Sequence, residues 1–171
     1  MPLKNTYKVI VSGDGGVGKT TLINQLVNKN QEVKMTPGLN LENLELKLEN
    51  DIKVDLILWD LGGQPQFRDF QDRFYGDAII VLLVFDLTRY TSFQNIENEW
   101  IPMILKDKDL HDCAKILIGN KVDLEQKIKE EYIQTFKKKH NLPYLTTSAK
   151  EAINIDHLKN LLCKMISSCK E

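Results

Sequence analysis

The chain has 171 residues, of which 42% are hydrophobic and 27% charged, as is ordinary for one soluble globular domain. We therefore expect a single domain over residues 1–171. The net charge of −1 gives no reason to expect nucleic-acid binding. No apolar run approaches membrane-spanning length, and the three cysteines lack metal-ligand spacing. These features predict a cytoplasmic protein with free thiols.

Apolar residues follow strand and helix periods in alternation along the chain. Strands are predicted over residues 7–12, 39–48, 52–59, 78–85, 115–119 and 143–147. Helical spacing is found over residues 22–27, 67–74, 93–104, 132–136 and 155–166. A short turn between the second and third strands predicts an antiparallel hairpin. The alternation predicts an α/β fold with a mostly parallel six-stranded sheet, one antiparallel edge strand and helices on both faces.

A glycine-rich loop follows the first predicted strand. Residues Gly13–Thr20 fit the P-loop pattern G-x-x-x-x-G-K-T, in which glycines let successive backbone N–H groups surround phosphate oxygens. Lys19 can reach β- and γ-phosphate oxygens, and Thr20 can ligate a bridging Mg²⁺. The alternative is a glycine-rich turn with a chance lysine, but the flanking strand and helix favour phosphate binding. The loop alone does not separate GTPases from ATPases or kinases.

A second group of polar residues follows the third strand. Asp60 ends an apolar run, where its carboxylate can hold Mg²⁺ directly or through water. Gly62 and Gly63 would let a backbone N–H approach a terminal phosphate, and Gln64 has an amide that can orient a water molecule. The alternative, a turn with Asp60 as a helix N-cap, accounts less well for the four residues together.

Two further stretches indicate a base pocket at the same sheet edge. Guanine presents two adjacent donors that the carboxylate of Asp123 can accept, whereas adenine offers no such pair. Lys121 can lay its aliphatic stem along the base, and Asn120 can either tie this loop to the P-loop or bond the base edge. After the last strand, a backbone amide within Ser148–Lys150 could donate to the guanine carbonyl; a helix cap at Ser148 is the alternative.

In this order, over nearly the whole chain, these stretches resemble the nucleotide motifs of Ras-superfamily small GTPases. The resemblance is mixed: residues 36–42 and 59–64 resemble Arf proteins, and residues 86–88 and 92–96 resemble Rab and Ras proteins. It implies a P-loop NTPase fold, the G domain, and a molecular switch that hydrolyses GTP to GDP and phosphate. The nucleotide contacts that it implies are Gly15, Gly16, Val17, Gly18, Lys19, Thr20, Thr21, Thr36, Gly63, Asn120, Lys121, Asp123, Ser148, Ala149 and Lys150. The implied Mg²⁺ ligands are Thr20, Thr36 and Asp60, and the implied catalytic residues are Gln64, Lys19 and Thr36.

The resemblance also implies effectors, exchange factors and GTPase-activating proteins as partners of a monomeric signalling protein. Two alternatives stay open: a nucleotide-binding module with little turnover, against which Gln64 argues, and a P-loop kinase or ATPase, against which Asp123 argues.

Several features depart from the Ras and Rab pattern. No aromatic residue lies between Thr20 and Thr36 to stack on the guanine, and Pro37 follows the switch threonine. Pro2 replaces the glycine that myristoylation needs and the chain does not end in C-a-a-X, so no lipid anchor is expected. The arginines are Arg68, Arg73 and Arg89, none in the loop before Thr36. We therefore predict slow intrinsic hydrolysis that needs an activating partner.

Overall fold

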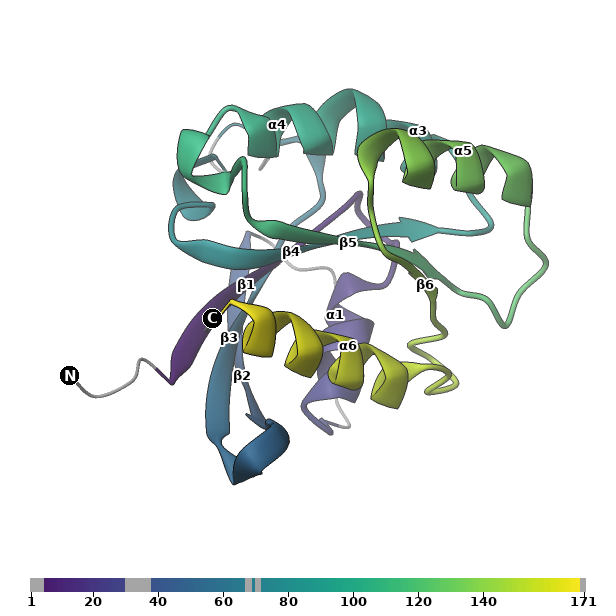
Figure 1. The fold of residues 1–171 in the computed structure, drawn as a ribbon. Coiled ribbons are helices and arrows are strands. Elements are labelled where there is room, and N and C mark those ends of the chain that lie inside the picture. Colours follow the sequence, from purple (N-terminus) through teal and green to yellow (C-terminus); the bar gives the residue numbers. More distant parts are fainter. Residues whose placement is uncertain (1–4, 30–37, 67–68, 70–71, 170–171) are drawn as a thin grey trace.

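The computed structural model describes residues 5–29, 38–66, 69 and 72–169 and contains a central six-stranded sheet (Figure 1). Its strands are β1 (Thr6–Ser12), β2 (Leu39–Lys47), β3 (Lys53–Leu61), β4 (Ala78–Asp86), β5 (Ala114–Asn120) and β6 (Tyr144–Thr146). Their order across the sheet is β2-β3-β1-β4-β5-β6. Only the edge strand β2 runs antiparallel to its neighbour, β3. The predicted fold class is confirmed.

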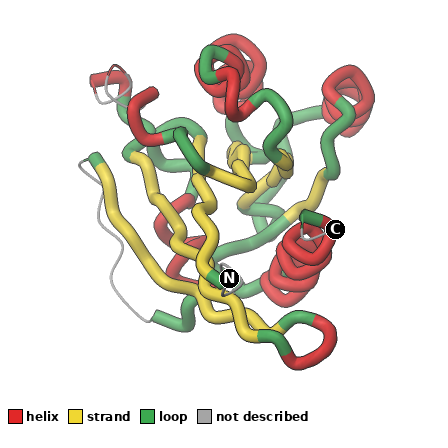
Figure 2. The backbone as a smooth tube through the Cα atoms, turned by 60° about the vertical axis from the view of Figure 1, so that its left-hand side comes forward, coloured by secondary structure: helices red, strands yellow, loops and turns green. Residues whose placement is uncertain are grey.

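Helices cover both faces of this sheet, as Figures 1 and 2 show. They are α1 (Lys19–Leu26), α3 (Tyr90–Asn95), α4 (Ile101–Leu105), α5 (Glu130–His140) and α6 (Ile155–Ser168). Short 3-10 turns lie at Glu49–Asp51, Asp72–Phe74 and Lys108–Leu110. Helices α1 and α6 lie on one face, and α3, α4 and α5 lie on the other. Within the described residues, no helix combines the length and the apolar character needed to cross a membrane.

Each face of the sheet has its own apolar core. Val9 and Val11 of β1 pack in the cluster that includes residues of α1 and α6, while Ile10 packs in the cluster of α3 and α5. All three side chains are fully buried. Because successive strand residues point to opposite faces, a strand covered on both sides must be apolar throughout. This explains the apolar run over residues 9–11 in β1 and the longer apolar run of β4.

The helical stretch predicted over residues 93–104 is present, but it is not a regular α-helix throughout. A π-helical turn, Ile96–Trp100, separates α3 from α4. Pro102 lacks a backbone N–H and cannot make the regular helical hydrogen bond to the turn before it, which favours an irregularity at this place. The wider turn brings Asn95 and Trp100, five positions apart, against the same partner, Asp14. The predicted helical spacing is therefore confirmed over this stretch, and the π-helical turn within it is a feature that the sequence did not predict.

Some predictions fall on residues outside the described ranges. These are the switch residue Thr36, the apolar residues Phe67 and Phe70, and Arg68. Phe74, which the spacing assigned to a helix with them, lies in the 3-10 turn Asp72–Phe74. The three cysteines are free, as predicted.

Candidate nucleotide-binding site

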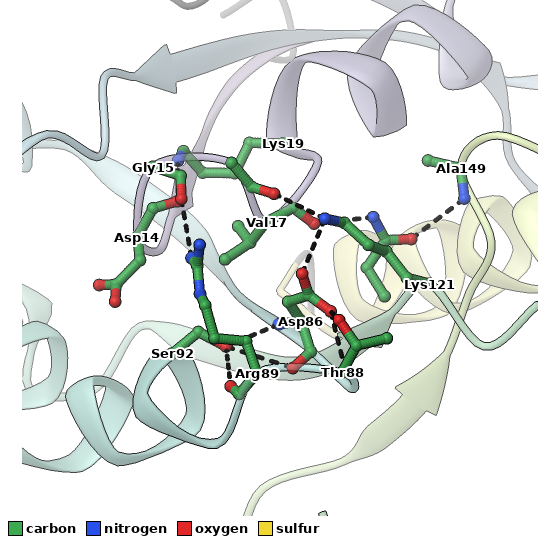
Figure 3. Close-up of polar contacts among 12 residues, drawn as sticks. Asp14, Gly15, Val17, Lys19, Asp86, Thr88, Arg89, Ser92, Lys121 and Ala149 are labelled. Carbon is green, nitrogen blue, oxygen red and sulfur yellow. Dashed lines mark hydrogen bonds and ion pairs between the residues drawn. The ribbon is translucent and has the colours of Figure 1, made fainter. Parts of the chain in front are cut away.

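The loops after β1, β4 and β5 meet at one edge of the sheet (Figure 3), and the loop after β3 contacts the first of them. Parallel strands bring their carboxyl ends to the same edge, so residues far apart in the sequence converge there. The contacts are direct: Gly15 N–H donates to the Gly63 carbonyl over 3.1 Å, and Lys121 Nζ donates to the Gly16 carbonyl over 2.8 Å. The predicted convergence of the motifs is confirmed for the described residues.

The carbonyl groups of the P-loop are held by side chains from around it. Lys19 Nζ donates to the Gly13 and Asp14 carbonyls over 2.8 and 2.9 Å. The next three carbonyls accept from Arg89 Nη2 at 2.7 Å, Lys121 Nζ at 2.8 Å and Asn120 Nδ2 at 2.9 Å, in the order Gly15, Gly16, Val17. In a trans peptide, C=O and N–H point in opposite directions. The amides that follow these three carbonyls therefore face the other side of the loop, as an anion site requires.

Two of the three predicted Mg²⁺ ligands lie together. Thr20 Oγ1 donates to Asp60 Oδ2 over 2.5 Å, and Asp60 is completely buried at the end of β3. A hydroxyl and a carboxylate are the oxygen ligands that Mg²⁺ prefers, with phosphate oxygens and water completing its shell. The described residues contain no cluster of three or more His, Cys, Asp or Glu side chains suited to a metal. The pair therefore fits a Mg²⁺ ion shared with a phosphate group.

The loop after β3 packs closely on the P-loop. A Cβ atom on Gly63 would lie only 2.3 Å from the Asp14 carbonyl carbon and 2.4 Å from the Gly13 oxygen and the Gly15 nitrogen. Only glycine allows this approach. Gln64 lies next to the same place, since a Cβ on Gly15 would be 3.7 Å from its Cγ. The structure thus places Gln64 beside the P-loop, with its side-chain oxygen accepting from Gln66 Nε2.

A cavity of about 260 Å³ lies beside the P-loop and contains the predicted base-recognition residues. Its lining residues are Gly18, Thr21, Asn120, Lys121, Asp123, Leu124, Ala149 and Lys150. Asp123 is exposed, so its carboxylate is available to a ligand in this cavity. The P-loop and the N-K-V-D stretch therefore border one shared space.

The structure shows one of the two roles considered for Asn120, the tie between its own loop and the P-loop. Its amide is buried; Nδ2 donates to the Val17 carbonyl, and Oδ1 accepts from Thr147 Oγ1 at 2.9 Å and Ala149 N–H at 3.0 Å. Asn120 therefore ties three loops together. The Ser148 hydroxyl caps a turn by accepting from Glu151 N–H at 3.0 Å, whereas the helix cap considered for it is not formed, because α6 begins at Ile155.

Asp86 is a site residue whose role the sequence did not reveal. It lies at the end of β4, and its Oδ2 pairs with Lys121 Nζ at 2.7 Å while Oδ1 accepts from Thr88 N–H and Oγ1. Burial opposes its ionisation, but the hydrogen bonds from Lys121 and Thr88 outweigh burial and lower the pKa of the Asp86 carboxyl. The position of Asp86 after a buried strand, at the edge that carries the other motifs, was the signal that could have indicated it.

Comparison with known proteins agrees with this geometry. The sequence profile of the Ras family matches residues 8–168. The chain is 37% identical over 170 residues to Ypt/Rab-type GTPase Rab7 of Gibberella zeae, covering 94% of this chain and 82% of that protein. It is 38% identical over 163 residues to Ras-related protein Rab7 of Glycine max (90% and 78%), and 32% over 164 residues to Ras-related protein Rab-13 of Rattus norvegicus (94% and 79%). The chain therefore belongs to the Ras family, with Rab-like relatives, and is a small GTPase that acts as a GTP-hydrolysing molecular switch.

Proposed function

We propose that the site described above performs this function as one Mg²⁺-dependent G domain over residues 1–171. One observation carries the proposal: Gly18 of the P-loop and Asp123 line the same cavity, so a phosphate group and a guanine base can be held at once. The contact between Thr20 and Asp60 supports a metal site at the phosphate end.

The proposed roles at the phosphate end follow from the charges there. The ammonium of Lys19, on a side chain only 6% exposed, and the inward-facing loop amides would stabilise negative charge on the transferred phosphoryl group. Thr20 and Asp60, together with Thr36, would hold Mg²⁺, which would neutralise negative charge on the phosphate groups. Gln64 would orient water, whose oxygen bonds to the γ-phosphorus as the bond to the β–γ bridging oxygen breaks. The products are GDP and phosphate.

The proposed roles at the base end concern specificity and assembly. Asp123 would accept the two adjacent guanine donors, and the aliphatic stem of Lys121 would lie along the base. Thr21, Ala149 and Lys150 line the same cavity, which supports their place in the nucleotide site. Asn120 and Ser148 would act by holding the loops in register.

The switch itself is proposed to lie in the loops near Thr36 and Gly63. The γ-phosphate would hold Thr36 and the Gly63 amide, and its loss would release both loops. Gly62 N–H donates to the Gly38 carbonyl over 2.6 Å, which supports coupling between the two loops. Leu39 and Leu41 of β2 are 38% and 48% exposed beside them, which supports a surface for effectors. We propose exchange factors and GTPase-activating proteins as further partners, and we propose that the Arf-like stretches contribute to the choice of partner. We also propose that the protein is a cytoplasmic, monomeric signalling protein.

The experiment is to identify the nucleotide carried by the purified protein and then follow phosphate release in a single turnover of GTP or ATP. We expect GDP or GTP in the protein, and slow hydrolysis of GTP but not of ATP. Gln64→Leu should slow hydrolysis further and leave GDP affinity unchanged, while the control Gln134→Leu, in α5 and outside the nucleotide cavity, should match the parent. Bound adenine nucleotide, or GTP held without any turnover, would overturn the proposal.

A further inference from the structure

Arg89 holds a carbonyl of the P-loop that no predicted nucleotide residue holds. Its Nη2 donates to the Gly15 carbonyl over 2.7 Å, between the carbonyls capped by Lys19 and those capped by Lys121 and Asn120 (Figure 3). Its other terminal nitrogen, Nη1, lies 3.7 Å from where a Cβ on Gly16 would stand. The guanidinium therefore lies along the loop at Gly15 and Gly16.

The backbone of Arg89 is held firmly in this place. Its N–H donates to the Asp86 carbonyl over 2.9 Å, and its carbonyl accepts from the N–H and hydroxyl of Ser92 at 3.1 and 2.7 Å. Ser92 is fully buried, and its hydroxyl also accepts from Asp86 N–H over 2.9 Å. Because Asp86 pairs with Lys121 as well, one turn orients both cations that cap neighbouring P-loop carbonyls.

The charge of Arg89 is directed at the loop. Among the ion pairs between described residues, none involves Arg89, so the Gly15 carbonyl is its partner there. A hydrogen bond from a charged donor is shorter and stronger than a neutral one, and it polarises the peptide that accepts it. The Gly15 carbonyl and the Gly16 N–H belong to the same planar peptide and point in opposite directions. The bond from Arg89 therefore orients and polarises the Gly16 N–H.

The same peptide segment contacts the loop after β3, which contains Gly63 and Gln64. Gly15 N–H donates to Gly63, and Gln64 lies beside Gly15. We propose that Arg89 is a positioning residue for GTP hydrolysis: it holds the Gly15 carbonyl so that the Gly16 N–H faces the transferred phosphate and Gly15 keeps its contact with Gly63. This proposal rests on the proposed nucleotide site. It gives Arg89 a role that the sequence did not predict.

The test compares Arg89→Ala with the parent, and uses Lys138→Ala, which removes one positive charge from the exposed end of α5, as control. We expect single-turnover GTP hydrolysis to fall about ten-fold in Arg89→Ala, the order expected for one charge-assisted hydrogen bond. Arg89→Lys should recover part of the rate, and millimolar guanidinium should restore part of it in Arg89→Ala. In GDP-loaded protein, the ¹H–¹⁵N signal of Gly16 should shift in Arg89→Ala and stay in Lys138→Ala.

A merely structural contact would lower thermal stability and GDP affinity as much as the rate, without rescue by guanidinium, and this result would overturn the proposal. A parent-like rate of hydrolysis in Arg89→Ala, or an unchanged Gly16 signal in that variant, would also overturn the proposal. If Arg89→Ala does not fold, Arg89→Gln is measured instead, and a parent-like rate there would also overturn it. Failure of the parent to hydrolyse GTP would count against the proposed function, while the Gly16 signal would still test the orientation of this peptide.

Discussion

The indole of Trp100 donates a 2.8 Å hydrogen bond from Nε1 to Oδ1 of Asp14, the second residue of the P-loop. Trp100 is completely buried, and the other carboxylate oxygen of Asp14 accepts from Asn95 Nδ2 over 2.7 Å. The π-helical turn between Asn95 and Trp100 gives both side chains access to the same carboxylate. The helix that follows β4 is thereby fastened to the phosphate-binding loop.

Trp100→Phe should destabilise the protein through the loss of this donor. A buried carboxylate oxygen deprived of a hydrogen bond costs about 1–3 kcal/mol, and the smaller ring adds a packing loss. Urea denaturation of the GDP-loaded protein measures the change in the free energy of unfolding. Trp59→Phe is the control, because Trp59 is only partly buried and stacks under Lys8 Nζ, 3.7 Å from its ring centroid. Equal losses in the two variants would contradict a special role for the contact with Asp14.

Gly63→Ala should abolish the close packing of the loop after β3 on the P-loop. The added Cβ would meet backbone atoms of Gly13, Asp14 and Gly15 at 2.3–2.4 Å, and backbone cannot yield as a flexible side chain can. We expect hydrolysis to fall at least ten-fold, as misplacement of a catalytic group does. Gly76→Ala is the control, since its Cβ would meet nothing within 4 Å. Single-turnover phosphate release is measured for both variants and for the parent. Parent-like hydrolysis by Gly63→Ala would refute the prediction.

Asp123→Asn should change the preferred base. The amide replaces one of two acceptor positions with a donor, so guanine affinity should fall about ten-fold or more, the order for a charge-assisted bond. The affinity for xanthine nucleotides should rise, because the edge of xanthine offers an acceptor at this position. Competition of GDP and XDP against a fluorescent nucleotide measures both effects. Asp112→Asn, outside the cavity, serves as control, and an unchanged guanine preference in Asp123→Asn would exclude Asp123 from base recognition.

Thr20→Ala should weaken the dependence of nucleotide binding on Mg²⁺. The substitution removes the hydroxyl that lies 2.5 Å from Asp60 Oδ2, and with it one proposed metal ligand. In the parent, EDTA should speed GDP release strongly, whereas in Thr20→Ala release should already be fast and respond little to EDTA. Thr135→Ala, on the exposed side of α5, should behave as the parent. A strong, parent-like response to EDTA in Thr20→Ala would remove Thr20 from the metal site.

The sequence alone was sufficient for the fold and for the convergence of the polar motifs at one edge of the sheet. Apolar periodicity predicted the strands and the covered faces, because a residue's neighbours along the chain determine which face of a strand or helix it occupies. The glycines and Lys19 predicted the P-loop, and the position of Asp60 and Asp123 after buried strands predicted that both would lie at one edge of the sheet. All these inferences depend on short-range sequence patterns and on the rule that parallel strands bring their carboxyl ends to the same edge of a sheet.

Only the tertiary structure decided which distant side chains hold the P-loop. Arg89 and Gly15 are 74 positions apart and Trp100 and Asp14 are 86 apart, so no local period relates them. The π-helical turn escaped prediction for a related reason: its residues keep an apolar spacing that a regular α-helix also satisfies, and hydrogen bonds to Asp14 favour the wider turn. Sequence patterns specify the face on which a side chain lies, whereas the packing of loops at the sheet edge determines the partner that it meets.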